Sequence, residues 1–407
     1  MTVDLRDPLA SHWSLDPDVT FLNHGSFGAC PTPVRDYRAQ LLDRLEAQPV
    51  DFMIRSLPQM YFDTVRRLED FLGAEQGSLA LVANATSGVA TALAAVDLRP
   101  GERIVTTGQE YFATRNAVHR RAAEAGAEVV EASAPFPVAG AEELIASIAE
   151  QVDRRTALVV VDHIFSPSGM VLPLAGFLEA LGPNRPPVLV DGAHGPGQVE
   201  LDLAGLGVDF YTGNCHKWLC SPKSCAVLYV RPDRQERVRP LAQSYTPADI
   251  RAPISRFQLE HYWNGTYDPT PRLAVPAALD FMGGLFAEGW PEVMSRNRER
   301  VLEGRETVCS ALGQPPPCPA ELVGSMAAVV LPWSEPPHPR RADWTDPLQR
   351  RLRELGIEVP VTWSRSPPRR MLRISAQLYN GPAEYGLLAD ALRAVPDVNY
   401  RTVPDVN

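Results

Sequence analysis

The chain has 407 residues, of which 45% are hydrophobic and 22% charged, and its formal net charge is −10. This composition is typical of a globular protein that is long enough for more than one domain. An acidic chain without a basic stretch excludes nucleic acid as an expected partner. No run approaches the roughly 18 apolar residues of a membrane span, so we expect no membrane partner. The N-terminus lacks a signal-peptide pattern and the six cysteines are sparse, which predicts a reduced, cytoplasmic protein.

The first residues, 1–20, are a polar lead-in that we expect to form an N-terminal arm. Two glycines and a proline follow within seven positions, at 25–31, and predict an irregular loop. Taken by itself, this stretch is better interpreted as a structural turn. Apolar residues at helical spacing then predict helices over 33–47 and 58–73.

A short apolar strand at 79–82 runs into Asn84-Ala85-Thr86-Ser87-Gly88, and a helical pattern follows. The free N–H groups and hydroxyls at such a helix start can hold a phosphate group. Any helix with a polar N-cap has the same pattern, however, so this stretch alone does not define a site.

Apolar runs and helical patterns then alternate along the chain. Strands are predicted at 103–106, 128–130, 157–161, 187–190, 207–211 and 225–230, with helices at 114–126 and 140–152 among them. This rhythm predicts an α/β fold, in which a mostly parallel sheet of the seven-stranded type lies between helices. Ligands bind at the carboxyl ends of such strands. Those ends carry Thr86, Tyr111, Asp162, Asp191 and Lys217.

The C-terminal part predicts a smaller α+β region. It follows helices at 272–287 and 290–312, and it contains strands at 325–331, 357–359 and 371–375 and helices at 346–355 and 382–394, with 363–368 interpreted as a loop. The predicted organisation is an arm (1–20), a large cofactor-binding domain (21–285), a small domain (286–395) and a tail (396–407).

Asp191 closes one predicted strand and Lys217 follows the next. A pyridoxal phosphate site needs this arrangement, because the lysine forms a Schiff base with the aldehyde while the aspartate keeps the pyridine nitrogen protonated. The sequence contains neither a Gly-x-Gly-x-x-Gly motif nor a triphosphate-binding loop, which counts against a nucleotide-binding enzyme. Our main hypothesis is a pyridoxal 5'-phosphate (PLP) enzyme that binds its cofactor through Lys217.

Seven stretches resemble the class V aminotransferase group of fold type I PLP enzymes, in its isopenicillin N epimerase-like branch. They occur in family order and include Asn23-His24-Gly25-Ser26-Phe27-Gly28, Asn84-Ala85-Thr86-Ser87-Gly88, Asp162-His163-Ile164-Phe165-Ser166, Asp191-Gly192-Ala193-His194, Asn214-Cys215-His216-Lys217-Trp218, Gly265-Thr266-Tyr267-Asp268 and Leu372-Arg373-Ile374-Ser375. The resemblance implies the fold, the PLP cofactor and a homodimer with its active site at the interface.

The resemblance also implies residue roles. Lys217 would be the catalytic acid and base at Cα, and the cofactor would be bound by Thr86, Ser87, Tyr111, Asp191, His194, His216 and Thr266, with Thr266 reaching the phosphate of the neighbouring subunit. The substrate would be bound by Asn23, His24, Phe112, Phe165 and Arg373, with Arg373 on its carboxylate. No metal is expected, because Cys215, Cys220 and Cys225 lack typical ligand spacing.

The reaction remains open at this stage, because loss of the Cα proton is common to several outcomes. We favour β-elimination from an S-substituted cysteine, a C–S lyase reaction, because it needs only Lys217 and a leaving group. Epimerisation, decarboxylation-coupled oxidative deamination and transamination stay as alternatives, together with a degenerate binding protein without activity. Cysteine desulfuration is discounted, because 363–368 holds no cysteine. Phe112 and Phe165 stand where the family has smaller residues, which predicts a reshaped substrate pocket.

Overall fold

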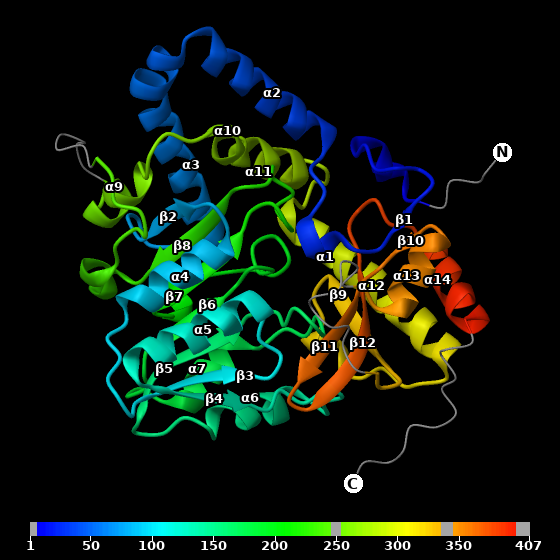
Figure 1. Ribbon diagram of the computed structural model, residues 1–407. Helices are drawn as coiled ribbons and strands as arrows, with labels where there is room; N and C mark the ends of the chain where they lie inside the picture. Colours follow the sequence, from blue (N-terminus) through cyan, green and yellow to red (C-terminus); the bar gives the residue numbers. More distant parts are fainter. Residues whose placement is uncertain (1–5, 246–253, 335–344, 396–407) are drawn as a thin grey trace.

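The computed structural model describes residues 6–245, 254–334 and 345–395 (Figure 1). A seven-stranded sheet lies at its centre, in the order β2-β8-β7-β6-β5-β3-β4. The strands are β2 (Leu79–Val82), β3 (Arg103–Thr107), β4 (Glu128–Ala132), β5 (Thr156–Asp162), β6 (Val188–Asp191), β7 (Phe210–Asn214) and β8 (Ala226–Val230). Only β8 runs against its neighbours, so the predicted mostly parallel α/β sheet is confirmed.

The sheet is buried on both faces, as the continuous apolar strands require. Successive side chains of β5 alternate between two hydrophobic cores: Val159 and Val161 belong to one, and Leu158 and Val160 to the other. The flanking helices are α2 (Thr32–Ala47), α3 (Leu57–Leu72), α4 (Ala85–Ala95), α5 (Phe112–Ala125), α6 (Ala141–Ala149), α7 (Leu174–Leu181), α8 (Leu203–Leu206), α9 (Arg256–Tyr262), α10 (Thr270–Leu273) and α11 (Val275–Gly283). Both faces of every central strand therefore exclude water.

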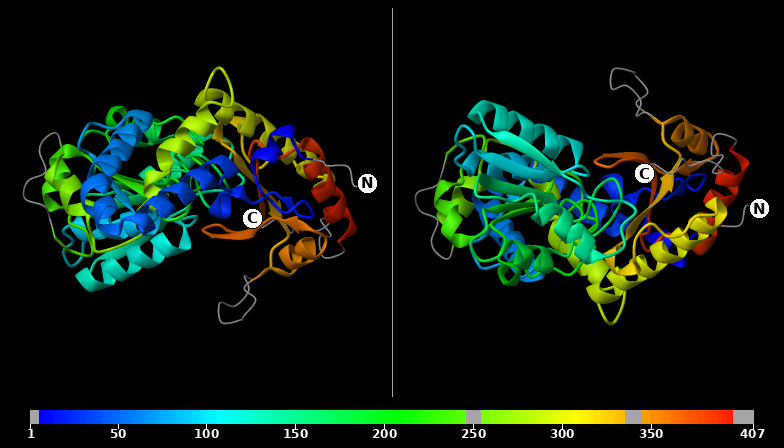
Figure 2. Two further views of the ribbon diagram at one scale, coloured as in Figure 1. Left: turned by 90° about the horizontal axis from the view of Figure 1, so that it is seen from above. Right: turned by 90° about the horizontal axis from the view of Figure 1, so that it is seen from below.

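A smaller antiparallel sheet follows, in the order β11-β12-β9, and lies beside the large sheet (Figures 1 and 2). Its elements are α12 (Trp290–Leu312), β9 (Met326–Leu331), α13 (Pro347–Glu354), β10 (Ile357–Glu358), β11 (Val361–Arg365), β12 (Pro368–Ser375) and α14 (Pro382–Ala394). Because α12 packs against both α14 and β9, we still propose a division between the large and small regions near residue 285, in the turn between α11 and α12.

The N-terminal segment packs against this smaller region, as the blue trace beside the orange and red elements shows (Figure 2). Strand β1 (Thr20–Phe21) pairs in parallel with β10, and the Asp7 N–H donates to the Tyr379 carbonyl. Helix α1 (His24–Phe27) follows directly and leads the chain to the edge of the large sheet. The arm is therefore fixed by backbone hydrogen bonds, and the predicted tail at 396–407 lies outside the described residues.

Three local predictions were wrong. The interpreted loop at 363–368 is largely strand β11, whose residues pair with β12 from Val361 to Arg365. The single helix predicted at 272–287 is divided into α10 and α11, because Pro271 and Pro276 each stand at a helix start, where a missing N–H is tolerated. Helix α9 was not foreseen. Among the described helices, none is both long and apolar enough to cross a membrane.

Candidate active site

A cavity of about 320 Å³ opens at the carboxyl ends of the central strands. Six of the residues predicted to form the site line it: Thr86, Tyr111, Asp191, His194, His216 and Lys217. The strand register explains why they meet, because Asp162, Asp191 and Thr212 are successive partners across β5, β6 and β7. Positions up to 50 residues apart in the sequence, from Asp162 to Thr212, are thereby brought to one edge of the sheet.

Lys217 lies in the turn after β7, and its Nζ is 3.0 Å from His194 Nε2. Burial lowers the pKa of Lys217 to about 7, and the charge of Arg373 acts in the same direction. Burial also holds the pKa of His194 well below its usual value, so the imidazole is neutral. A lysine with this pKa is a free amine in a large fraction of molecules near neutrality, which makes it a nucleophile and a base.

The chain contains two lysines, Lys217 and Lys223, and both line the cavity. Lys223 Nζ donates to the Gly28 carbonyl at 3.1 Å and is exposed. Lys217 is less exposed than Lys223, and burial lowers the pKa of Lys217 to about 7, which makes it the better nucleophile. The environment, more than the residue type, therefore singles out Lys217.

His24, the first residue of α1, supports the Lys217 backbone and is not among the described residues that line the cavity. His24 Nε2 lies 2.9 Å from the Lys217 carbonyl oxygen, and its Nδ1 lies 2.9 Å from the Tyr379 hydroxyl. Gly28 has a φ of +69°, and a Cβ there would lie 1.9 Å from the His216 carbonyl oxygen. Gly28 thus permits a close approach to the lysine turn, whereas a Cβ at Gly25 would meet Met326 and Ser375.

Asp191 is held in place at the closed end of the cavity. Its Oδ2 accepts from Thr114 Oγ1 at 2.6 Å, and its Oδ1 accepts from the Ala193 N–H at 3.0 Å. Burial raises the pKa of Asp191, while these donors and the Lys217 charge lower it. Thr114 comes from α5, and no local pattern of residues predicts this contact.

The other end of the cavity is a polar cradle at the start of α4. Asn84 caps the helix by accepting the Ser87 N–H at 2.9 Å, and Asn214 accepts the Ala85 N–H at 2.9 Å. Thr86 is exposed into the cavity. His216 Nδ1 is buried without a hydrogen-bond partner among the described residues. The hydroxyl of Thr86 at this helix start and the unpaired ring nitrogen of His216 fit an anionic group such as a phosphate.

Arg373, on β12, lies directly behind the cavity wall. One of its amino groups donates to the Ser166 carbonyl at 2.5 Å and the other to Ser26 Oγ at 3.1 Å, and both serines line the cavity. Asn23 continues this series of hydrogen bonds, because its Oδ1 accepts from Ser26 Oγ at 2.6 Å. The guanidinium is 3% exposed, and its Nε has no partner among the described residues.

Several predicted site residues lie elsewhere. Phe165, three residues after the end of β5, is fully buried in the hydrophobic core, so the structure does not support a role in the pocket. Phe112 is 57% exposed, and Phe112 and Ser87 are not among the described residues that line the cavity. Thr266 is exposed in its own chain. Sequence reasoning had missed Ser26, Ser166 and Thr114, which are common residue types without a motif of their own.

The residues present fit PLP, since a reactive lysine, a buried aspartate and a phosphate cradle line one cavity. Comparisons with known proteins agree. The "Aminotransferase class-V" family matches residues 54–252. The chain is 35% identical to an isopenicillin N epimerase from Amycolatopsis lactamdurans, over 93% of this chain and 96% of the relative. It is 31% identical to a putative L-cysteine desulfhydrase 1 from Oryza sativa subsp. japonica, over 92% of this chain and 82% of the relative.

The fold also matches the solved structure of the cystine C–S lyase C-DES in complex with cysteine persulfide. The TM-score is 0.74 at 21% identity, with 92% of this chain and 97% of the lyase covered. A C-DES variant with the same TM-score of 0.74 has glycine covalently linked to its PLP cofactor. The chain belongs to the class-V aminotransferase family of PLP-dependent enzymes. Its relatives include both C–S lyases and epimerases, and its cofactor is pyridoxal 5'-phosphate.

Proposed function

We propose that this enzyme is a C–S lyase that eliminates the β-substituent of cysteine or of an S-substituted cysteine. The observation that carries the proposal is the single enclosed base, Lys217, whose pKa is lowered to about 7, beside the buried cation Arg373. β-Elimination needs one base at Cα and an anchored α-carboxylate. The similarity to L-cysteine desulfhydrases along nearly the whole chain also supports it.

Each residue of the site has its own role in the proposed reaction. Arg373 binds the α-carboxylate, and its own position is fixed by Ser26 and Ser166. Lys217 Nζ takes the proton from Cα, and the C–S bond to the β-carbon breaks with release of the thiol. Asp191 balances a positive charge at the closed end of the cavity. PLP, when bound, supplies the electron sink that makes the Cα proton acidic.

The cofactor contacts proposed for this chain follow the same geometry. Asp191 would pair with the pyridine nitrogen, Tyr111 would lie on the ring, and Thr86 and His216 would hold the phosphate. Tyr111 stands at the N-cap of α5 and is partly buried, so its ring can cover one face of a flat cofactor. We keep the homodimer as part of the proposal, with Thr266 completing the phosphate site of the partner.

Sulfur transfer to an enzyme cysteine is not favoured. Among the residues that the structure describes, no cysteine lines the cavity, and five of the six free cysteines are buried. Burial raises the pKa of Cys220, the cysteine whose Sγ lies 3.8 Å from His24 Nε2, so it stays a neutral thiol. A sulfur acceptor would need an accessible thiolate near the substrate.

Epimerisation is the second candidate, because the isopenicillin N epimerase is 35% identical over nearly the whole chain. It needs a second group to deliver a proton to the opposite face of Cα. Tyr111 and Lys223 are the other titratable side chains that line the cavity beside the lysine, histidines and acids already described. A reaction that returns the proton would leave the substrate intact, whereas elimination destroys it.

The test is incubation of the PLP-loaded enzyme with L-cysteine, L-cystine and S-alkyl cysteines in D₂O. The proposal predicts that, with uptake of one water, pyruvate and ammonia form in equal amounts with the sulfur product, which is sulfide from L-cysteine, a persulfide from L-cystine and a thiol from an S-alkyl cysteine. Deuterium at Cα of a racemised amino acid, without pyruvate, would contradict it and identify an epimerase. Carbon dioxide with an aldehyde would instead indicate decarboxylative deamination, and a keto acid that keeps the side chain would indicate transamination.

A further inference from the structure

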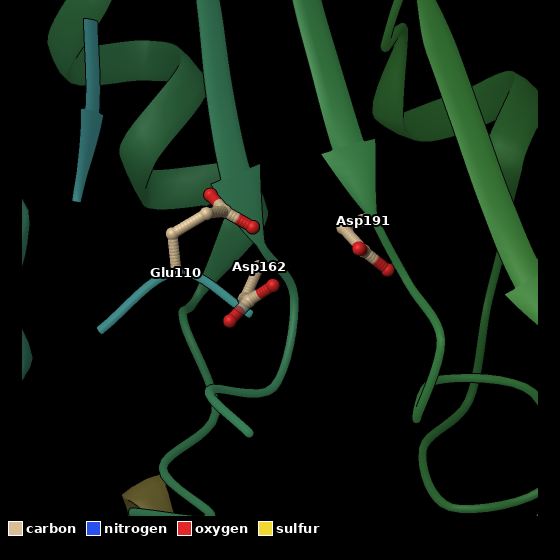
Figure 3. Close-up of side chains that lie close together, drawn as sticks. All are labelled: Glu110, Asp162 and Asp191. Carbon is tan, nitrogen blue, oxygen red and sulfur yellow. The ribbon is translucent and has the colours of Figure 1, made fainter. Parts of the chain in front are cut away.

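Three buried carboxyl groups, those of Glu110, Asp162 and Asp191, lie close together (Figure 3), and the last two line the cavity. Asp162 and Asp191 are the last residues of β5 and β6 and are direct partners in the register, while Glu110 comes from the turn after β3. One oxygen of each lies within 4.8 Å of the others. All three residues are buried: the exposed fraction is 6% for Glu110, 2% for Asp162 and 3% for Asp191. Only Asp191 has a role in the site described above.

The Glu110 carboxyl is incompletely paired by donors. Its Oε2 accepts from Thr106 Oγ1 at 2.9 Å, whereas Oε1 is buried and receives no donor from the described residues. Oxygens of the Glu110 and Asp162 carboxyls lie close together, within 4.8 Å, and one of the Glu110 oxygens is buried and unpaired. An ionised carboxylate only accepts hydrogen bonds, so these two groups can pair only when one of them carries a proton.

The surrounding charges favour one shared proton. Burial raises the pKa of Glu110 to about 8 and that of Asp162 well above its usual value, and the Asp191 charge raises both further. The Ser166 N–H donates to Asp162 at 3.4 Å and lowers the pKa of this carboxyl, but it is the smallest of the contributions. On the cavity side, Lys217 feels the charge of both Asp162 and Asp191, and Arg373 repels it. If both Glu110 and Asp162 were ionised, three negative charges would lie together with that of Asp191. If both were protonated, Asp191 would be the only negative charge of the three carboxyls facing Lys217 and Arg373.

We propose that Glu110 and Asp162 form a carboxyl pair that shares one proton, and that its single negative charge helps Asp191 to keep the pyridine nitrogen of PLP protonated. Asp162 lines the cavity beside Asp191, and Glu110 is not among the described residues that line it. Both are positioning residues, because the pair acts through Asp191. A negative charge in a low-dielectric interior stabilises a nearby cation at short range. The inference rests on the cofactor and on no particular reaction.

The proposal predicts that the effects of substituting the two residues are not additive. In Glu110→Gln or Asp162→Asn, the amide donates a hydrogen bond to the remaining carboxyl, which ionises, so one negative charge is kept. In the double variant no charge remains. The holoenzyme, loaded with PLP that carries ¹⁵N in the ring, reports the protonation of that nitrogen by its NMR shift as the pH is raised. The single variants are expected to titrate like wild type, and the double variant about one pH unit lower, a tenfold change in protonation.

Asp97→Asn is the matched control, since this exposed carboxyl pairs only at the surface with Arg237. A double variant that titrates like wild type would overturn the proposal, as would a single variant that shifts as far as the double. Infrared spectra decide the case even if the double variant does not fold. A protonated-carboxyl band is expected in wild type and should be lost in each single variant, and its persistence in either would contradict the shared proton. No substrate is needed, so failure of the proposed elimination leaves this test unchanged.

Discussion

The two ends of the cavity are built in different ways. At the closed end, Asp191 is 3% exposed, held by Thr114 and Ala193, and backed by the pair of Glu110 and Asp162. At the open end, Thr86 is exposed at the start of α4, and His216 Nδ1 has no partner among the described residues. The closed end is fixed by sheet register within one chain. The open end still has unfilled hydrogen-bonding capacity, which is where we propose that the cofactor phosphate and the partner's Thr266 belong.

The largest effect is expected from breaking the closed end with Asp191→Asn. An amide cannot stabilise a protonated pyridine nitrogen by charge, so kcat should fall by about 10³-fold. Thr114→Val is the matched comparison, because it removes one hydrogen bond to Asp191 and keeps the charge. We expect it to lower kcat by about tenfold at most. Steady-state kinetics on both variants test this order, and equal losses would contradict the charge role of Asp191.

Arg373 links the cavity to the small sheet, and Arg373→Gln should raise KM by about 10- to 100-fold, because a charge-assisted carboxylate contact is lost. Arg370→Gln is the control on the same strand. Arg370 forms a buried ion pair with Asp346 at 2.6 Å, so its loss should lower the melting temperature without a comparable change in KM. A KM unchanged in Arg373→Gln would remove this residue from substrate binding.

The lowered pKa of Lys217 can be tested by the pH dependence of PLP attachment. Because burial lowers that pKa to about 7, the reactive neutral amine should increase between pH 6 and pH 8 and then level off. The rate of PLP attachment to the apoenzyme should therefore rise by about tenfold over this interval. Stopped-flow absorbance measures it. A rate that keeps rising toward pH 10 would mean that the lysine has its ordinary pKa.

The smallest effects are expected at the open end. Thr86→Val removes one hydroxyl among several phosphate donors, so PLP affinity should fall by about tenfold. Thr266→Val should lower it by a similar or smaller factor if a partner supplies this residue. Mixing Thr86→Val with Thr266→Val subunits would then restore one intact site in each mixed dimer. Unchanged affinity in Thr266→Val, or a monomer in sedimentation, would contradict the proposed shared site.

The sequence predicted the central sheet well because its evidence is local. Apolar runs such as 157–161 have the length and composition of strands covered on both faces, and each ends in a polar residue that the register then gathers. Lys217, Asp191 and Thr86 were therefore predictable as neighbours. Strand β11 was not, because Pro367 and Pro368 follow it and a proline-rich stretch is typical of a loop.

Contacts that depend on strand order could not be read from the chain. Glu110 meets Asp162 because β3 lies beside β5, although β4 intervenes in sequence. Arg373 was expected to bind the substrate carboxylate, but its partners Ser26 and Ser166 come from distant segments and were not expected. Phe165 was misplaced because an aromatic residue after a strand can face either the cavity or the core, and only packing decides.

The central claim is that Lys217, and not Lys223, holds the cofactor. The chain has only these two lysines, so the answer is unambiguous. Borohydride reduction of the PLP-loaded enzyme fixes the cofactor to its lysine, and peptide mass spectrometry then locates it. The phosphopyridoxyl mass should be found on Lys217 in wild type and on neither lysine in Lys217→Ala. A label on Lys223 in the wild-type enzyme, or none on either lysine, would contradict the account.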